Sequence, residues 1–191
     1  AIQAPAGAGK TRAAKLYKMQ HENVIHIECN EFMNRKHFLS EVLEKIGLDG
    51  SGSVSAMMKT VVKHASKFSS FLIILDEVDK LNDTVLYFFI TLYNMLSDRC
   101  GFVLMSTNYF QKRIERGLAL NKKGYQEIFS RIGRRFIDLK EPQHNDVRMV
   151  CEANGLRDPQ IITEIYNECE GDLRRVERSL HKYNRTRSKA A

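Results

Sequence analysis

The eight residues Ala4–Thr11 read A-P-A-G-A-G-K-T, in which small residues lead to a lysine and a hydroxyl residue. In a phosphate-binding loop, small residues let backbone N–H groups converge on a phosphate, the lysine reaches the β and γ oxygens, and the hydroxyl ligates Mg²⁺. Ala4 stands where such loops usually begin with glycine, which is tolerable if its φ is negative. The segment therefore predicts a site for ATP and Mg²⁺. A Gly/Ala-rich turn before a helix is the alternative.

The residues after this loop are good helix formers, so the phosphates would face the N-terminus of a helix and its partial positive charge. We expect the nucleotide to be bound by the loop and the first residues of that helix. The predicted binding residues are Pro5, Ala6, Gly7, Ala8, Gly9, Lys10, Thr11 and Arg12.

Two carboxylates, Asp76 and Glu77, directly follow the apolar run F-L-I-I-L at residues 71–75. Ligands of open α/β sheets bind at the carboxyl ends of the strands, so both side chains are expected beside the phosphates. Asp76 would hold Mg²⁺ together with Thr11, partly through water, and Glu77 would orient the water that attacks the γ-phosphate. An acidic pair that begins a solvated loop is the alternative. Together with Lys10, however, the pair favours ATP hydrolysis.

Further polar residues follow at intervals that suit the same site. Asn108 ends the run V-L-M-S-T-N, where it would help position the attacking water or close an Asx-turn. Arg131, Arg134 and Arg135 lie in F-S-R-I-G-R-R-F, from which one guanidinium would neutralise transition-state charge at a neighbouring subunit's γ-phosphate. A solvated basic face would explain any of these arginines equally well.

Arg174 lies in G-D-L-R-R at residues 171–175, where the last helix is predicted to begin. A small lid would bring this arginine onto the nucleotide, so it is a candidate for both binding and catalysis. An ordinary helix start is the alternative, with Asp172 near the positive end of the helix dipole.

The elements expected to position these residues alternate between strands and helices, which predicts an open α/β sheet with right-handed crossovers. The run at residues 71–75 lacks polar alternation, as is typical of a parallel strand buried on both faces. Predicted strands are 24–29, 71–75, 102–106 and 136–139. One helix is predicted directly after the phosphate loop, a second ends at Gly47, and a third spans 54–67. A fourth has Asp83 as its cap and runs to Leu96. Three more cover 145–154, 159–168 and 172–184.

This pattern divides the chain of 191 residues into three parts. Residues 1–140 would form the α/β core, 141–185 a small helical lid, and 186–191 a frayed basic tail. Only three residues precede the phosphate loop, which is normally fed by a full strand, so we expect the chain to be part of a longer protein.

The composition of the chain favours some kinds of partner and argues against others. The formal net charge is +7, which favours a polyanionic partner such as nucleic acid. No apolar run reaches the roughly 18 residues that a membrane span requires, and the four cysteines lack the paired spacing of a zinc site or disulfide framework. We therefore expect a cytoplasmic protein without a membrane partner.

In this order and spacing, the motifs resemble those of the AAA+ ATPases. The resemblance implies a P-loop NTPase fold of three α/β/α layers, with a mostly parallel sheet and a small C-terminal helical lid. It also implies roles for single residues: Asn108 as sensor 1, Arg131 or, second, Arg134 as the arginine finger, and Arg174 as sensor 2.

Three segments look most like those of the B-type regulators of DNA transposition, the phage Mu B protein with its TniB and TnsC relatives. They are A-G-A-G-K-T-R-A-A-K-L-Y, L-D-E-V-D-K-L-N and I-F-S-R-I-G-R-R-F. That resemblance implies an ATP-dependent binder of double-stranded DNA, largely without sequence preference, encoded by a bacterium, phage or mobile element. It would oligomerise as a filament or ring and activate a transposase. The motif G-D-L-R-R is shared with clamp loaders and replication initiators, so an initiator or helicase loader is one alternative, and a nucleotide-gated scaffold with negligible hydrolysis is another.

Candidate DNA contacts are two basic clusters, although ordinary solvated helix faces would explain both. Phosphate contacts require only lysines and arginines on one surface and impose no spacing. The candidates are Arg35 and Lys36 after the strand at 24–29, with Lys112, Arg113, Lys122 and Lys123 around the loop predicted after Asn108.

Overall fold

The computed structural model describes residues 1–68, 70–96 and 99–190, and the chain forms two compact units. Unit 1 comprises Ala1–Gln3 and Lys10–Asp138, and unit 2 comprises Ala4–Gly9 and Leu139–Ala191. The phosphate-binding loop is thus grouped with the C-terminal helices, while Lys10 and Thr11 belong to unit 1.

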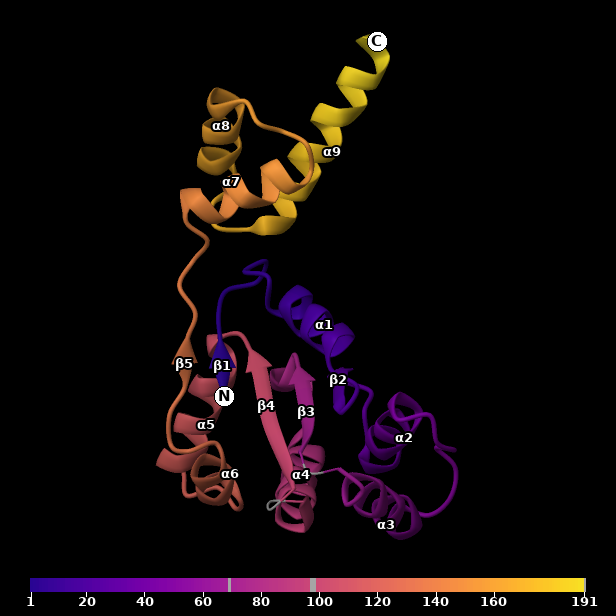
Figure 1. Ribbon diagram of the computed structural model, residues 1–191. Helices are drawn as coiled ribbons and strands as arrows, with labels where there is room; N and C mark the ends of the chain where they lie inside the picture. The colour runs from indigo at the N-terminus through magenta and orange to yellow at the C-terminus, as the bar shows by residue number, and fades with distance from the viewer. Residues whose placement is uncertain (69, 97–98, 191) are drawn as a thin grey trace. The chain divides into compact units, whose positions relative to one another are not determined.

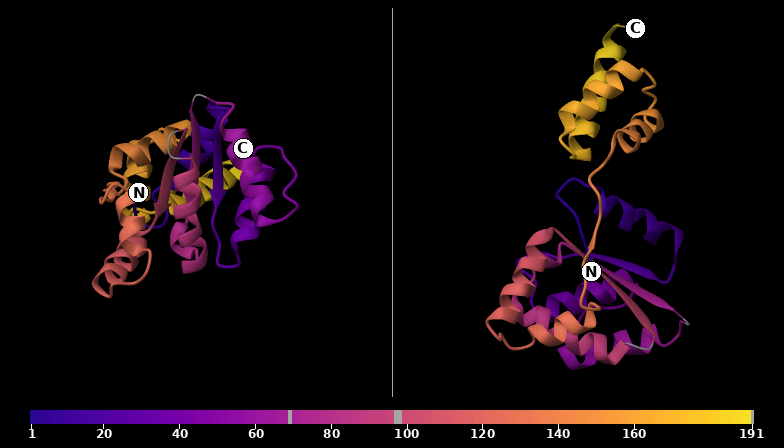
Figure 2. Two further views of the ribbon diagram at one scale, coloured as in Figure 1. Left: turned by 90° about the horizontal axis from the view of Figure 1, so that it is seen from below. Right: turned by 90° about the vertical axis from the view of Figure 1, so that its left-hand side faces the viewer.

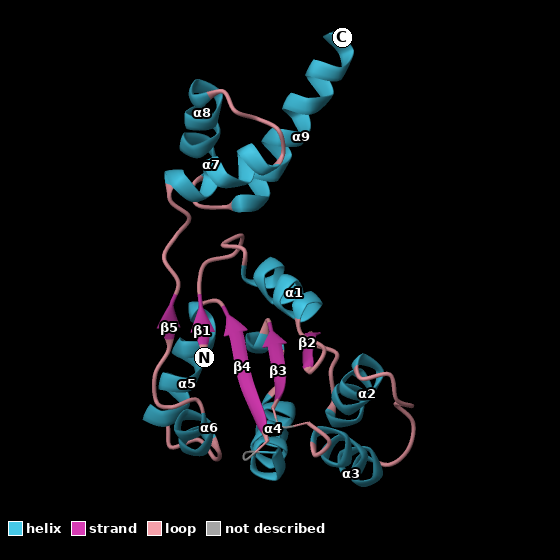
Figure 3. Cartoon of the chain, viewed as in Figure 1, coloured by secondary structure: helices cyan, strands magenta, loops and turns pink. Residues whose placement is uncertain are grey.

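Unit 1 is built on a sheet of five parallel strands in the order β2-β3-β4-β1-β5 (Figure 1, Figure 3). The strands are β1 Ile2–Gln3, β2 Val24–Glu28, β3 Phe71–Asp76, β4 Cys100–Ser106 and β5 Ile137–Asp138. Because every pair is parallel, the strands all end at the same edge of the sheet. The predicted α/β fold with a parallel sheet is confirmed.

Helices cover both faces of this sheet (Figure 1, Figure 2). On β3, Ile73 and Leu75 pack with α2 to α6, whereas Ile74 packs with Ala14 of α1. The continuous apolar run is therefore explained by burial on both faces, as its sequence predicts. The helical elements of this unit are α1 Lys10–Gln20, α2 Arg35–Lys45, α3 Val54–Ala65, the 3-10 turn η1 Val78–Lys80, α4 Asp83–Leu96, α5 Asn108–Ala119 and α6 Tyr125–Arg131.

The region after Asn108 was expected to be a loop, and this expectation is wrong. It forms α5, and a short turn then leads to α6. Gly117 lies inside α5 against the ring of Tyr125, and a Cβ at this position would fall 2.1 Å from that ring. The glycine therefore permits close packing of two helices and does not end the first one.

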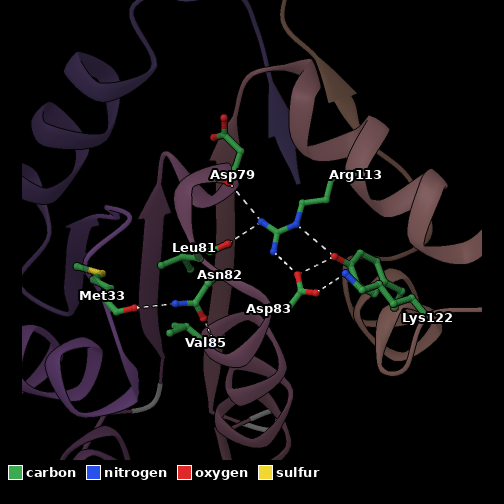
Figure 4. Close-up of polar contacts among 9 residues, drawn as sticks. Met33, Asp79, Leu81, Asn82, Asp83, Val85, Arg113 and Lys122 are labelled. Atoms are coloured by element: carbon green, nitrogen blue, oxygen red, sulfur yellow. Dashed lines mark hydrogen bonds and ion pairs between the residues drawn. The ribbon is translucent and has the colours of Figure 1, made fainter. Parts of the chain in front are cut away.

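The start of α4 also differs from the prediction, in which Asp83 was the helix cap. The cap is Asn82, whose Oδ1 accepts a hydrogen bond from the Val85 N–H at 3.1 Å and whose Nδ2 donates to the Met33 carbonyl (Figure 4). Asp83 is the first residue of the helix, which frees its carboxylate for partners elsewhere.

Those partners come from α5, α6 and the turn between them (Figure 4). Asp83 Oδ1 accepts hydrogen bonds from Arg113 Nη2 at 2.6 Å and from the Tyr125 hydroxyl at 2.9 Å, and Oδ2 pairs with Lys122 Nζ at 2.5 Å. Partial burial opposes ionisation, but hydrogen bonds from Lys122, Arg113 and Tyr125 outweigh it and lower the pKa of Asp83 to about 2. One carboxylate thus joins three segments.

Unit 2 contains the helices α7 His144–Ala153, α8 Pro159–Cys169 and α9 Leu173–Ala190. Their inward faces form a separate apolar core that includes Val147, Ile162 and Val176. All three helices were predicted, but α9 continues to Ala190. Residues 186–190, part of the tail expected to fray, are therefore helical. Within the described residues, no helix combines the length and apolarity needed to cross a membrane.

Replacing Asp83 with asparagine should lower the free energy of unfolding by about 2 kcal/mol at pH 7, because half-buried Arg113 loses its counter-charge. The pKa of Asp83 is depressed in the folded state, so its stabilisation is complete above about pH 4 and is lost as the pH falls toward about 2. Urea unfolding of both proteins across this range should show the difference shrinking. Glu164→Gln on the exposed side of α8 is the control, and a D83N variant as stable as wild type at pH 7 would contradict the assignment.

Candidate functional site

Asp76 ends β3 with a carboxylate that is only 1% exposed. Its Oδ2 accepts a hydrogen bond from the Thr11 hydroxyl at 2.6 Å, and its Oδ1 accepts one from the Glu77 N–H at 2.9 Å. The structure thus brings together two predicted site residues that lie 65 positions apart in the chain.

A third neighbour, His26 of β2, was missed by the sequence analysis. Its Nε2 lies 3.4 Å from Asp76 Oδ2, and both side chains are buried. Burial opposes ionisation of Asp76, but hydrogen bonds with His26 and Thr11 outweigh it, so the pKa of Asp76 is below its ordinary value. The carboxylate is therefore ionised at neutral pH. The available signal was a histidine among the buried apolar residues of the strand V-I-H-I-E.

Glu77 adopts a left-handed backbone conformation, with φ 55° and ψ 38°. A side chain in this region costs of order 1 kcal/mol, and such residues concentrate at functional sites. Its Oε2 accepts a hydrogen bond from Lys80 Nζ at 2.6 Å, which raises the pKa of Lys80. The carboxylate predicted to orient water is thus engaged by a lysine three residues later.

The phosphate-binding loop has a backbone that accounts for its residue types. Gly7 and Gly9 have φ values of 79° and 88°, which favour glycine, whereas Ala4 is not among the residues with positive φ. The alanine at the first position is therefore compatible with the loop. The helix predicted after the loop is α1, and it begins two residues earlier than expected, so that Lys10 and Thr11 are its first residues.

Within unit 2, the start of α9 contacts this loop. The Leu173 N–H donates to the Gly7 carbonyl at 3.0 Å, and a Cβ on Gly7 would lie 1.9 Å from Asp172 Oδ1. Arg174, the next residue, is exposed, and no ion pair of its side chain occurs among the described residues. Arg175, by contrast, pairs with Glu170 at 2.6 Å, so of the two arginines Arg174 is the one available for a ligand.

Asn108 lies at the carboxyl end of β4 as the first residue of α5, and it is exposed. The helix is capped by Thr107, whose hydroxyl accepts from the Tyr109 N–H and donates to Asp79 at 3.3 Å. Because β3 and β4 are paired and parallel, Asn108 and Asp76 follow neighbouring strands at the same edge of the sheet.

Arg131 lies elsewhere in unit 1. It ends α6, which leads into the amino end of β5, whereas Asp76 lies at the carboxyl end of β3 (Figure 1). Its Nε and Nη2 donate to Asn94 Oδ1 at 3.0 and 2.9 Å. The structure therefore does not bring Arg131 together with Asp76 in one chain. Arg134, at φ 57°, and Arg135 are both exposed beyond the same helix.

The predicted DNA contacts fall into two groups. Side chains on the surface include those of Arg35 and Lys36 at the start of α2, and of Lys112 and Lys123. Arg113 is different, because its guanidinium also donates to the Leu81 carbonyl at 2.6 Å and to the Tyr125 hydroxyl at 3.2 Å. The guanidinium of Arg113 is therefore engaged within the chain, and its contact with DNA stays a prediction. Lys122 is exposed, but its ammonium pairs with the Asp83 carboxylate, which also binds Arg113.

A model of the family described as "AAA domain" matches residues 1–114, which is more than half of the chain. A comparison with curated protein sequences found no significant match. Three solved structures are similar over nearly the whole chain. They are Cdc6p from Pyrobaculum aerophilum (TM-score 0.63, 17% identity, 97% of this chain), a DNA replication initiation factor (0.61, 13%, 96%) and AMPPCP-bound DnaA from Aquifex aeolicus (0.58, 15%, 98%).

At these identities the likeness shows the fold alone. The alignments cover 55%, 53% and 59% of those three chains, so this chain spans little more than half of their length.

The contact between α9 and the loop predicts that Gly7→Ala is more damaging than Gly47→Ala. Both glycines have positive φ, 79° and 73°, so both alanines carry similar backbone strain, but nothing lies within 4 Å of a Cβ at Gly47. Hydrogen exchange at the Leu173 amide should quicken only in Gly7→Ala, and a second change, Asp172→Ala, should restore part of the protection. Equal exchange in both single variants would contradict the contact.

Proposed function

The chain belongs to the AAA domain family, and on this premise we propose that it is an ATPase whose nucleotide state controls its assembly on DNA. The observation that carries the proposal is the hydrogen bond from the Thr11 hydroxyl to buried, ionised Asp76, with Glu77 beside it. This pairing of a phosphate-loop hydroxyl with a strand-end carboxylate is the arrangement that P-loop NTPases use for Mg²⁺.

The donors in unit 1 suit Mg²⁺, which prefers oxygen ligands and retains several waters. The Thr11 hydroxyl and the Asp76 carboxylate would hold the ion, which supplies charge neutralisation when it is bound. Lys10, at the start of α1, adds a cation for the β and γ oxygens. The role of Arg174, in unit 2, as a further cation for the nucleotide stays a prediction from the sequence.

Glu77 would accept and orient the attacking water, with Asn108 as its partner at the neighbouring strand end. The ion pair between Glu77 and Lys80 competes with this role, because Oε2 of Glu77 already accepts a hydrogen bond from the ammonium of Lys80. We therefore expect slow turnover by the isolated chain. An event that draws Lys80 away, such as DNA binding, would raise the rate.

For the class of DNA transaction, an initiator or helicase-loader type of ATPase has more support than a regulator of transposition. The solved structures similar to this chain include a Cdc6p, a DNA replication initiation factor and a DnaA, and the last of these is bound to AMPPCP. The motif G-D-L-R-R at residues 171–175 agrees with this assignment. Regulation of transposition is the second candidate, supported by the three sequence segments around Lys10, Asp76 and Arg131. The partner recovered with the full-length protein, a replicative helicase or a transposase, decides between them.

ATP binding is tested by Lys10→Ala, which should abolish measurable affinity because it removes a cation from the phosphate site. Isothermal titration calorimetry with ATP and Mg²⁺ measures this directly. Lys18→Ala changes an exposed lysine of the same helix and should bind ATP as the wild type does. Undiminished affinity in the Lys10 variant would remove the basis of the proposal.

Shared active sites are tested by Arg131→Ala, which should bind ATP normally but lose DNA-stimulated hydrolysis by about three orders of magnitude. Mixing it with Glu77→Gln should recover part of the activity, because some interfaces then combine an intact Glu77 with an intact Arg131. Asn94→Ala is the matched control, since it removes the same hydrogen bonds from Arg131 but leaves the guanidinium. A comparable loss in the Asn94 variant, or no recovery on mixing, would count against a role in trans.

A further inference from the structure

A basic pocket of about 410 Å³ lies in unit 1, lined by residues of α5, of the turn after it, and of the starts of α4 and α6. None of its lining residues is among those that carry the proposed ATP chemistry. Its charged lining consists of four cations, Lys112, Arg113, Arg116 and Lys122, and one carboxylate, Asp83. This volume is in the range of sites that hold a nucleotide-sized group.

The pocket wall is fixed by the Asp83 network (Figure 4). Asp83 binds Arg113 and Lys122, while the Tyr125 hydroxyl donates to Asp83 and accepts from Arg113 Nε. The Tyr125 ring is buried against Gly117, where no larger residue fits. The one carboxylate of the lining is therefore paired with Arg113 and Lys122, and no carboxylate of the lining balances the charges of Lys112 and Arg116.

That charge is concentrated on Lys112 and Arg116. Both are exposed and lie four residues apart on α5, and neither side chain makes an ion pair with any residue that the structure describes. Like charges at this helical spacing repel each other. An anion bound between them removes the repulsion, so the geometry favours a ligand that carries phosphates.

The rim of the pocket adds exposed apolar surface. Tyr109, one turn before Lys112, is 63% exposed, and Leu120 is 67% exposed. An exposed aromatic ring beside cations that bind phosphates is the combination with which proteins hold single strands, because each base can stack on the ring.

We propose that this pocket binds the phosphate backbone of a nucleic-acid strand through Lys112, Arg116 and Lys122, with one base stacked on Tyr109. The inference rests on the proposed DNA-binding function and gives it a location. Contacts to phosphates carry no sequence information, so binding is sequence-tolerant and weakens with salt.

A second basic pocket, of about 280 Å³, is less suited to a strand. Its lining comes from α9 alone and consists of Arg178, His181, Lys182, Arg185 and Thr186. It includes no carboxylate that fixes the cations, and its one ring is the imidazole of His181. It serves as a competing location in the test.

The test measures fluorescence anisotropy of labelled duplex and single-stranded DNA with the full chain across a salt series. K112E/R116E should weaken binding at least about tenfold and reduce the salt slope by about two, one for each lost phosphate contact. The control K59E/K63E on α3 makes the same charge change at the same spacing on two exposed lysines and should bind nearly as the wild type does. Tyr109→Ala should weaken single-strand binding about fivefold or more. Thermal melting checks that each variant is folded.

Three results would overturn the pocket assignment. If K112E/R116E and K59E/K63E lose DNA affinity equally, the loss reflects the net charge of the chain and not the pocket. Loss in R178E/K182E with normal binding by K112E/R116E would move the strand to α9. The third result concerns ATP. If the Lys10→Ala variant still binds some ATP, and if adding K112E/R116E removes that binding but leaves DNA binding intact, the pocket is a site for free nucleotide.

These outcomes differ from failure of the proposed function. A wild-type chain that binds ATP but neither duplex nor single-stranded DNA would contradict the coupling to DNA itself. A wild-type chain that binds DNA, with K112E/R116E binding equally well, would contradict the pocket alone.

Discussion

Burial of the Asp76 carboxylate is the constraint on which the rest of the site depends. Desolvating an ionised carboxylate is costly unless hydrogen bonds replace the lost water. Here the Thr11 hydroxyl from α1, the Glu77 N–H and the ring of His26 supply them, and the ring of His26 is within reach because β2 pairs with β3 in the parallel sheet. On the other side of β3, pairing with β4 puts Asn108 at the same edge of the sheet. The ionised state of Asp76 therefore depends on groups that the sheet and α1 hold around it.

The strand pattern and the phosphate loop could be predicted from the sequence because both are local. An apolar run as short as residues 71–75 is typical of a strand buried on both faces. A loop of small residues before Lys10 is typical of a phosphate-binding site. The errors came from residues whose roles depend on distant partners. The region after Asn108 was expected to be a loop but forms α5, whose Gly117 packs against Tyr125. Asp83 was expected to cap α4, but its carboxylate binds Arg113. No spacing rule reveals such partners.

The candidate site shows the same limit. Thr11 and Asp76 could be paired by motif, but the sequence could not show that His26 joins them, that Glu77 has a left-handed backbone, or that Lys80 binds its carboxylate. Arg131 could be recognised as a candidate from its motif. Its separation from Asp76 follows only from the direction of the strands, which is a property of the whole sheet.

That separation has a consequence for assembly. If Arg131 completes the site of a neighbour, each subunit presents a donor surface near the amino end of its sheet and a receptor surface at the carboxyl end. A twofold dimer cannot satisfy both surfaces, because they lie at opposite ends of the sheet and do not form one self-complementary interface. Subunits would instead add with one polarity, and an open assembly would have one end with an unfilled ATP site and another with an unused arginine. Growth and disassembly would then be unequal at the two ends.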